Sequence, residues 1–153
     1  MPGEIPIRIA VVGVGNCASA LVQGVTYYRR NPHDETGLMH PVLGGGGDGK
    51  GLRVGDIHFA CAFDVDERKI GRRLGGPEGA IFSAPNLAKI FCRDPEDDGA
   101  RVFAGPLRDG VAAHLETYAE GQRARVSAAA RTAARGDVVR VLKETGATVL
   151  VNY

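Results

Sequence analysis

The feature that most constrains the fold is a short apolar run that ends at a glycine turn and continues at once into an amphipathic segment. Residues 7–12 read I-R-I-A-V-V, and their β-branched side chains are typical of a strand buried on both faces. From Asn16 to Arg30 apolar residues recur at helical spacing, which predicts a helix with one face free to pack on a sheet. This order of strand, turn and helix favours a parallel α/β fold.

The turn between these two elements has the spacing of a phosphate-binding loop. Residues 13–18 read G-V-G-N-C-A and match the pattern G-x-G-x-x-G/A between a first strand and a helix, where the pattern has a physical meaning. Gly13 allows the tight turn, Gly15 has no side chain to keep a diphosphate from the backbone, and Ala18 lets helix and strand approach closely. The helix N-terminus adds free N–H groups and partial positive charge. We predict a dinucleotide site here; the alternative is a structural glycine turn without a ligand.

An acidic residue follows the second predicted strand. In folds of this type an acid at that position accepts hydrogen bonds from the adenosine ribose and repels a 2′-phosphate, so Asp64 favours NAD over NADP. The usual spacing is about 20 residues after the glycines, whereas here a long segment intervenes. The alternative is that Asp64 or Asp66 only caps the next helix, and Asp66 is the more favourable cap.

The rest of the chain predicts a sheet. Further strands are expected at residues 57–63, 101–104 and 147–151, and residues 31–55 are expected to form a long glycine-rich loop. Strands that alternate with helices indicate a doubly wound, parallel α/β sheet of the Rossmann type with right-handed crossovers. We expect one domain over residues 1–153, with about four strands in an incomplete sheet.

The later helices are predicted from residues that cap helix N-termini and from a glycine that ends a helix. They are a short helix after Asp66, a buried helical turn at residues 87–91, a helix from Asp109, and a helix whose N-cap is Asp137 and whose stop is Gly146. With the first helix, they would cover both faces of the sheet.

Composition excludes several other classes of protein. With 44% apolar residues, 24% charged residues and a formal charge of +1, the chain is expected to be an ordinary globular protein without a nucleic-acid partner. No apolar run reaches the roughly 18 residues of a membrane-spanning helix, so no membrane partner is expected. Residues 1–6 lack the features of a secretory signal. We expect a cytoplasmic protein.

Cysteines and histidines give no sign of a metal site. Cys17, Cys61 and Cys92 form no C-x-x-C pair, and the histidines show no ligand spacing. Cys17 is predicted to be a small buried residue rather than a nucleophile. The arginines of residues 123–140 are interpreted as a solvated helix face rather than a nucleic-acid site, because no aromatic residues are interleaved with them.

Longer motifs indicate a resemblance to one protein family. Residues 7–24, I-R-I-A-V-V-G-V-G-N-C-A-S-A-L-V-Q-G, closely resemble the start of actinobacterial-type inositol-3-phosphate synthases, also called myo-inositol-1-phosphate synthases. G-L-M-H at residues 37–40, A-F-D-V-D at 62–66 and V-L-V-N-Y at 149–153 continue the resemblance in the same order. Shorter matches lie at residues 42–45, 69–71, 80–82, 85–86, 105–106 and 109–110. Residues 44–55 and 121–136 depart from the family's pattern.

This resemblance implies a cofactor and a reaction. Enzymes of this family use a bound NAD, which is consumed and restored, to convert D-glucose 6-phosphate into 1D-myo-inositol 3-phosphate for inositol and phospholipid biosynthesis. The NAD-binding residues that the resemblance implies are Gly13, Val14, Gly15, Asn16, Cys17, Ala18, Asp64 and Asn152. The residues of the turn would hold the diphosphate, Asp64 the ribose, and Asn152 would lie near the cofactor crevice.

The resemblance implies no catalytic residue in this chain. Enolisation and aldol closure need a base and cationic groups, and in this family the lysines concerned belong to a domain downstream of the L-V-N-Y strand. None of the lysines here matches a catalytic motif. We therefore expect the catalytic domain to be absent, and glucose 6-phosphate to bind only if that domain is supplied. The last strand would have an open edge, through which a second copy or another chain could pair.

Two other functions stay open at this point. A non-catalytic NAD-binding or interaction module would use the same turn together with the open edge strand. The amino-terminal domain of another NAD-dependent oxidoreductase would explain the glycine turn, but not G-N-C-A-S together with G-L-M-H.

Overall fold

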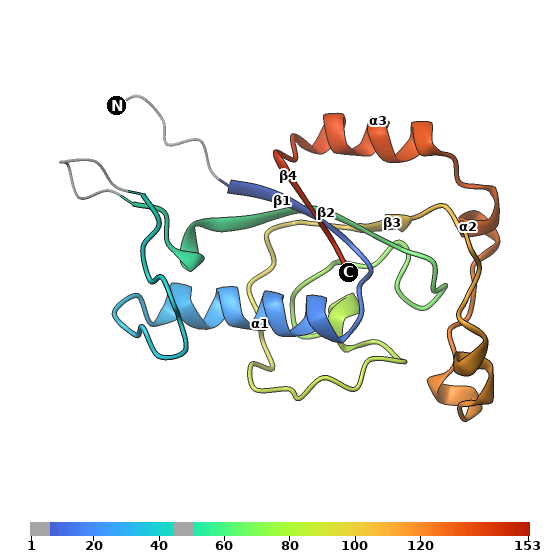
Figure 1. Ribbon diagram of the computed structural model, residues 1–153, viewed down its shortest axis with the longest axis horizontal. Coiled ribbons are helices and arrows are strands. Elements are labelled where there is room, and N and C mark those ends of the chain that lie inside the picture. The colour runs from blue at the N-terminus through green and yellow to red at the C-terminus, as the bar shows by residue number, and fades with distance from the viewer. Residues whose placement is uncertain (1–6, 45–50) are drawn as a thin grey trace.

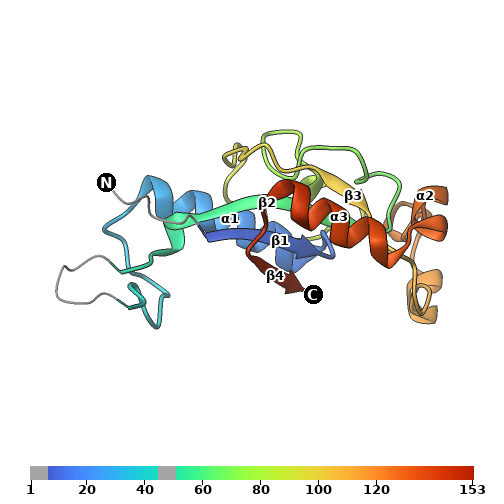
Figure 2. The ribbon, with the colours of Figure 1, turned by 90° about the horizontal axis from the view of Figure 1, so that it is seen from above.

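A four-stranded parallel sheet organises the chain. The computed structural model describes residues 7–44 and 51–153, so part of the predicted glycine-rich loop lies outside the described residues. The strands are β1 (Ile7–Val12), β2 (Ile57–Asp64), β3 (Val102–Ala104) and β4 (Val149–Asn152). They lie in the order β3-β2-β1-β4, and each neighbouring pair is parallel (Figures 1 and 2). The predicted parallel sheet is confirmed, with the last strand beside the first.

Helices lie on both faces of this sheet. α1 (Asn16–Arg30) covers one face and α3 (Arg135–Thr145) the other, with the short helix α2 (Ala128–Thr132) before α3 (Figure 1). This is the doubly wound arrangement that the alternation of elements predicted. Short 3₁₀ helices in the connecting segments are Val54–Asp56, Ala80–Phe82, Ala113–Thr117 and Glu120–Gln122.

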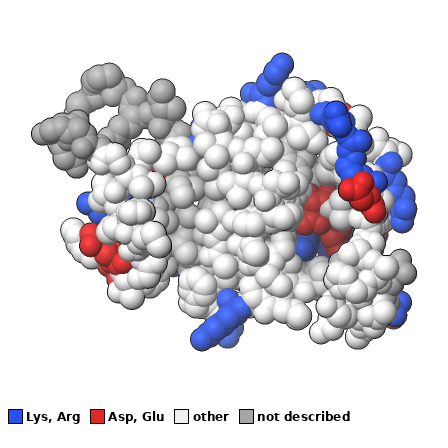
Figure 3. All heavy atoms as spheres, viewed as in Figure 1, with Lys and Arg blue, Asp and Glu red and all other residues white. Residues whose placement is uncertain are grey.

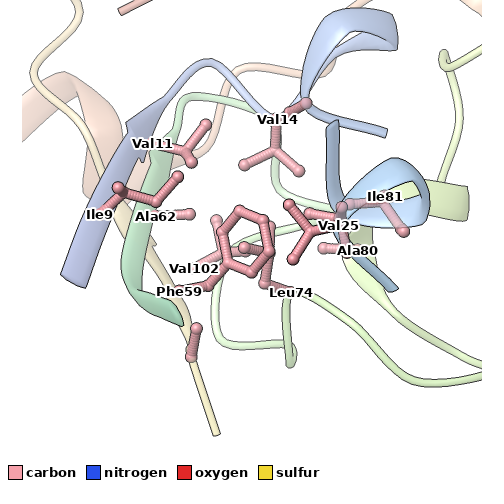
Figure 4. Packing of buried hydrophobic residues seen from close by; sticks show 13 residues of the cluster. Ile9, Val11, Val14, Val25, Phe59, Ala62, Leu74, Ala80, Ile81 and Val102 are labelled. Carbon is pink, nitrogen blue, oxygen red and sulfur yellow. The ribbon is translucent and has the colours of Figure 1, made fainter. Parts of the chain in front are cut away.

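Alternating side chains of the central strands supply both halves of the core. Ile9 and Val11 of β1 pack on the α1 side with Val25, whereas Ala10 packs on the α3 side with Val141. Figure 4 shows the α1 side, to which Val14, Phe59, Ala62, Leu74, Ala80, Ile81 and Val102 also contribute. Successive strand residues point to opposite faces, so β1 is buried on both faces, as its apolar run predicted.

The pairing of β1 with β2 contains one irregularity. Ile9 lies opposite Phe59 and Ala10 lies opposite Cys61, so Ala60 has no partner in β1. A bulge of this kind adds one residue to one strand. Beyond it the two strands stay in register to their carboxyl ends, where Val12 lies opposite Phe63.

Two predicted helices after the second and third strands do not form. The residues after Asp66 make hydrogen-bonded turns, and Gly71 interrupts them with a φ of +85°. The helix expected from Asp109 is replaced by the 3₁₀ helix Ala113–Thr117, preceded by Gly110 at a φ of +80°. In both segments a glycine in the left-handed region lies where the sequence predicted continuous helix.

The buried helical turn expected at residues 87–91 is also wrong. Leu87 is 71% exposed, and the segment has no helical hydrogen bonds. The N–H groups of Phe91 and Cys92 donate instead to the side-chain oxygen of Gln23 in α1, at 2.9 and 3.0 Å. Because a buried glutamine satisfies these donors, the segment lies against α1 without helical structure of its own.

The last helix forms, but it begins earlier than predicted. Its N-cap is Ala134, and Asp137 lies at the third helical position, where its carboxylate accepts the Ala134 N–H at 2.9 Å. Gly146 ends the helix at a φ of +65°, as the sequence predicted. The sequence did not predict α2, which starts after Ser127, whose Oγ accepts the Ala129 N–H at 3.1 Å.

Candidate functional site

The glycine turn between β1 and α1 uses its two glycines for different reasons. Gly13 has a φ of +87°, which residues with side chains rarely adopt, and its N–H donates to the Phe63 carbonyl at 2.9 Å. Gly15 has extended backbone, and a Cβ added there would meet no heavy atom within 4 Å. The space beside the Gly15 backbone is therefore open.

The start of α1 offers its backbone donors to an anion. Gly15 is the N-cap, no side chain caps the helix, and its first turn carries no acidic residue. The first N–H groups of a helix have no partner within the helix and carry partial positive charge. Ala18 is fully buried, so α1 lies close to the sheet at this point.

The other residues of the turn divide between core and surface. Val14 is fully buried and points into the core on the α1 side (Figure 4). Asn16 is exposed, and its Oδ1 accepts the N–H of Leu87 at 2.6 Å. Cys17 is exposed, so the prediction of a small buried residue is wrong. The buried face of α1 begins at Ala18, and Cys17 falls on the surface before it.

Asp64 at the end of β2 faces the glycine turn. Its Oδ2 accepts the N–H of Val14 at 2.7 Å, and its Oδ1 accepts the N–H groups of Val65 and Asp66 at 2.7 and 2.8 Å. The side chain is 10% exposed. A carboxylate has about four acceptor positions, so Oδ2 keeps one for a further donor.

Lys69 and Asn86, for which the sequence predicted no role, form hydrogen bonds with the backbone of the turn. The Nζ of Lys69 donates to the Val14 carbonyl at 2.6 Å and to Asn86 Oδ1 at 2.9 Å. The Nδ2 of Asn86 donates to the Val14 carbonyl at 3.0 Å and to the Ile81 carbonyl at 2.9 Å. Burial lowers the pKa of Lys69, and the nearby carboxylate of Asp64 opposes that shift. Their only signal in the sequence is membership of the short matched motifs K-I-G and P-N.

A cleft of about 670 Å³ lies at the carboxyl ends of β1, β2 and β4. Gly13, Asp64 and Asn152 line it together, and Arg108 and Arg135 contribute positive charge. The lining is completed by Val12, Phe63, Val65, Gly105, Pro106, Val138, Val139, Leu150 and Tyr153. Parallel strands bring their carboxyl ends to one edge of the sheet, and this edge is where nucleotides bind in open α/β sheets.

The structure thus brings three of the predicted site residues into one cleft and places the others beside it. Asn152 lies opposite Val12 in the pairing of β4 with β1. The N–H of Tyr153 donates to the Val12 carbonyl at 3.1 Å, which holds the end of β4 against the turn. Asn16 and Cys17 lie on the surface at the start of α1, outside the cleft lining.

Residues 7–44 and 51–153 contain no group of three or more His, Cys, Asp or Glu side chains placed to hold a metal ion. No helix among them has the length and apolar character needed to cross a membrane. On the face shown in Figure 3, lysine, arginine and acidic side chains lie around the margins, and much of the centre is uncharged.

Comparison with curated proteins shows which proteins the chain is similar to. The chain is 42% identical over 149 residues to inositol-3-phosphate synthase of Mycolicibacterium smegmatis, and 39% identical over 149 residues to that of Corynebacterium glutamicum. The chain is a homologue of inositol-3-phosphate synthases. Each alignment covers 96% of this chain and 36% of the relative, so this synthase homologue spans about a third of the length of the relatives it matches. No protein-family model matches the chain.

Solved structures share the fold of this synthase homologue. The crystal structure of Ari2 matches with a TM-score of 0.65 and 29% identity, over 96% of this chain and 37% of that one. A myo-inositol-1-phosphate synthase-related protein from Thermotoga maritima matches with a TM-score of 0.59 and 20% identity, over 95% of this chain and 34% of that one. The second likeness shows the fold alone. The resemblance to inositol-3-phosphate synthases and the α/β fold are both confirmed.

Proposed function

We propose that this chain binds NAD across the glycine turn and serves as the NAD-binding part of an inositol-3-phosphate synthase. The observation that carries the proposal is that Asp64 contacts the turn next to the open backbone of Gly15 and also lines a cleft that reaches Asn152. Dinucleotides bind in such a crevice between strand ends. Homology to the synthases over 96% of the chain supports the same assignment.

In this proposal each part of the site serves one part of the cofactor. The backbone of residues 13–18 binds the diphosphate, and Asp64 Oδ2 accepts a hydrogen bond from a ribose hydroxyl. Asn152 lies at the crevice beside the turn. Arg108 and Arg135 are exposed, and neither has an ion-pair partner among the described residues, so their charge is available to the phosphates.

The proposed reaction is that of the synthases, conversion of D-glucose 6-phosphate into 1D-myo-inositol 3-phosphate. NAD, when bound, supplies a hydride acceptor that later returns the hydride. The residues of this chain bind and orient NAD, and we assign none of the described residues a catalytic role. Binding of glucose 6-phosphate then depends on a catalytic domain. The free cysteines, Cys17, Cys61 and Cys92, fit a reducing, cytoplasmic location.

A second candidate is a non-catalytic module that pairs through β4. Val149 and Leu150 of this strand are 47% and 50% exposed, and β4 has β1 as its one partner in the described sheet. Unpaired strand edges recruit other chains. A concentration-dependent dimer in sedimentation velocity, lost in Val149→Lys, would support this function; a monomer at all concentrations would contradict it.

Calorimetric titration with NAD tests the first proposal. We expect saturable binding by the wild-type chain and binding at least about tenfold weaker in Gly15→Ala, because a methyl group there would stand between the backbone and the diphosphate. Gly24→Ala is the matched control, since Gly24 lies within α1, away from the turn, and an added Cβ there also meets no atom within 4 Å. Wild-type protein without saturable NAD binding overturns the proposal.

A further inference from the structure

The buried lysine beneath the glycine turn makes none of the NAD contacts proposed above. Lys69 is 3% exposed, and its Nζ lies 2.6 Å from the Val14 carbonyl, 2.9 Å from Asn86 Oδ1 and 3.7 Å from Asp64 Oδ2. We propose that Lys69 is a positioning residue, which neutralises Asp64 and holds the Val14 carbonyl so that the turn accepts a diphosphate. This inference rests on the proposed NAD site. It gives the reason why the diphosphate of NAD, with two negative charges, can bind close to the carboxylate of Asp64.

Asp64 and Lys69 hold the two polar backbone groups of the same residue. The N–H of Val14 donates to Asp64, and the carbonyl of Val14 accepts from Lys69 and from Asn86. The Nδ2 of Asn86 also lies 3.3 Å from the carbonyl of Gly15. The peptide groups on both sides of Val14 are therefore fixed before any ligand arrives. A site organised in advance loses less entropy when its ligand binds.

Charge is the second part of the argument. The neighbouring Asp66 is covered by Arg68, whose Nε lies 2.9 Å from Oδ1 and whose Nη2 lies 2.6 Å from Oδ2. Among the described residues, Lys69 is the cation within 4 Å of Asp64. Charges a few ångströms apart interact strongly when water is excluded. Without the ammonium group, the carboxylate of Asp64 would repel a diphosphate bound at the turn.

A double-mutant cycle separates this electrostatic role from a merely structural one. The probe is ADP-ribose, which carries the diphosphate and the adenosine ribose, titrated by calorimetry into wild type, Lys69→Met, Asp64→Asn and the double variant. We expect Lys69→Met to weaken binding at least about tenfold when Asp64 is present, and less than about threefold in the Asp64→Asn background. Thermal melting confirms that each variant is folded.

The outcomes of the cycle are decisive in both directions. A loss confined to the Asp64 background supports the role of Lys69, because only charge neutralisation depends on that carboxylate. The same loss in both backgrounds overturns the neutralisation of Asp64 by Lys69, and no loss in either background overturns the whole proposal. Wild-type protein that binds neither NAD nor ADP-ribose contradicts the proposed function itself, which distinguishes the two failures.

A second pair of variants tests the role of Lys69 if Lys69→Met does not fold. Asn86→Asp keeps Lys69 and adds a carboxylate against its Nζ, whereas Asn86→Ser removes the same amide donors without adding charge. We expect ADP-ribose to bind at least about threefold more weakly to Asn86→Asp than to Asn86→Ser. Equal binding by the two variants overturns the proposal.

Discussion

The carboxylate of Asp64 accepts a hydrogen bond from the N–H of Val14 at 2.7 Å, across a separation of 50 residues in the chain. The contact joins the end of β2 to the turn after β1. It exists because β1 and β2 pair in parallel, so that both strands end at the same edge of the sheet. One carboxylate therefore helps to shape the turn and also lines the cleft beside it.

The charge of Asp64 is predicted to set the preference for NAD over NADP. Asp64→Asn keeps an oxygen that can accept the Val14 N–H but removes the charge that would repel a 2′-phosphate. We expect the ratio of the Kd for NADP to the Kd for NAD to fall about tenfold, which is about 1.4 kcal/mol of discrimination. Asp94→Asn, at an exposed position that does not line the cleft, is the control. An unchanged ratio in Asp64→Asn would count against this role.

Arg135 is predicted to attract the phosphates of NAD. It lies at the first position of α3 and lines the cleft. We expect Arg135→Ala to weaken NAD binding by about threefold to tenfold at low ionic strength, and by less at high salt, because salt screens exposed charges. Lys143→Ala removes a charge at the other end of the same helix and should leave NAD binding unchanged. Titrations at two salt concentrations check this, and equal effects of the two substitutions would contradict it.

The two glycines of the turn are predicted to respond differently to alanine. Gly13 has a φ of +87°, so Gly13→Ala should lower the free energy of unfolding by about 1–2 kcal/mol. Gly15 has an ordinary φ of −92° and open space, so Gly15→Ala should unfold at the same denaturant concentration as wild type. Urea titration followed by circular dichroism measures both. Equal stability of the two variants would disagree with the backbone geometry.

A partly buried ion pair is predicted to make stability depend on pH in the acid range. Both oxygens of Asp98 accept hydrogen bonds from Arg29, at 2.9 and 3.0 Å, and Oδ2 also accepts the Phe59 N–H at 2.9 Å. Burial would raise the pKa of Asp98, but the bonds from Arg29 and Phe59 outweigh it and hold that pKa below its ordinary 3.8.

The sign of the effect follows from where the protons bind. When the pH falls to the ordinary pKa of 3.8, Asp98 binds a proton in the unfolded chain but not yet in the folded protein, so stability falls as pH drops. The contribution of the pair is fully present above about pH 5 and is lost as pH falls through the pKa of folded Asp98. Asp98→Asn should cost about 2 kcal/mol at pH 7, since Arg29 keeps its ion pair with Glu96, and should flatten the acid dependence. Unfolding titrations from pH 7 to pH 3, with Asp94→Asn as control, test this; a slope unchanged by Asp98→Asn would contradict it.

Elements defined by neighbouring residues were predictable from the sequence. The bounds of β1, the start and end of α1, and Gly146 as the stop of α3 agree with the apolar spacing and the glycine positions. The segments after Asp66 and Asp109 were not predictable in this way. Their few apolar residues fit a helical pattern, but glycines at positive φ and bonds to distant groups decide the backbone there.

The same difference between local and long-range determinants applies to the candidate site. The backbone geometry of the turn at residues 13–18, with the positive φ of Gly13 and the open space beside Gly15, could be predicted because it depends on six consecutive residues. Lys69 and Asn86 could not be assigned, because each acts on the Val14 carbonyl from another part of the chain. Cys17 was misplaced, because a cysteine's usual burial says nothing of the helix face it lies on.

The sequence by itself determined the opening strand, the glycine turn and the helix, since side-chain periodicity and the conformational freedom of glycine are local properties. Only the tertiary structure decided that Asp64 and Lys69 hold opposite polar groups of Val14. These contacts depend on strand order and on the parallel register, which bring distant residues to one edge of the sheet. No periodicity along the chain encodes these long-range contacts.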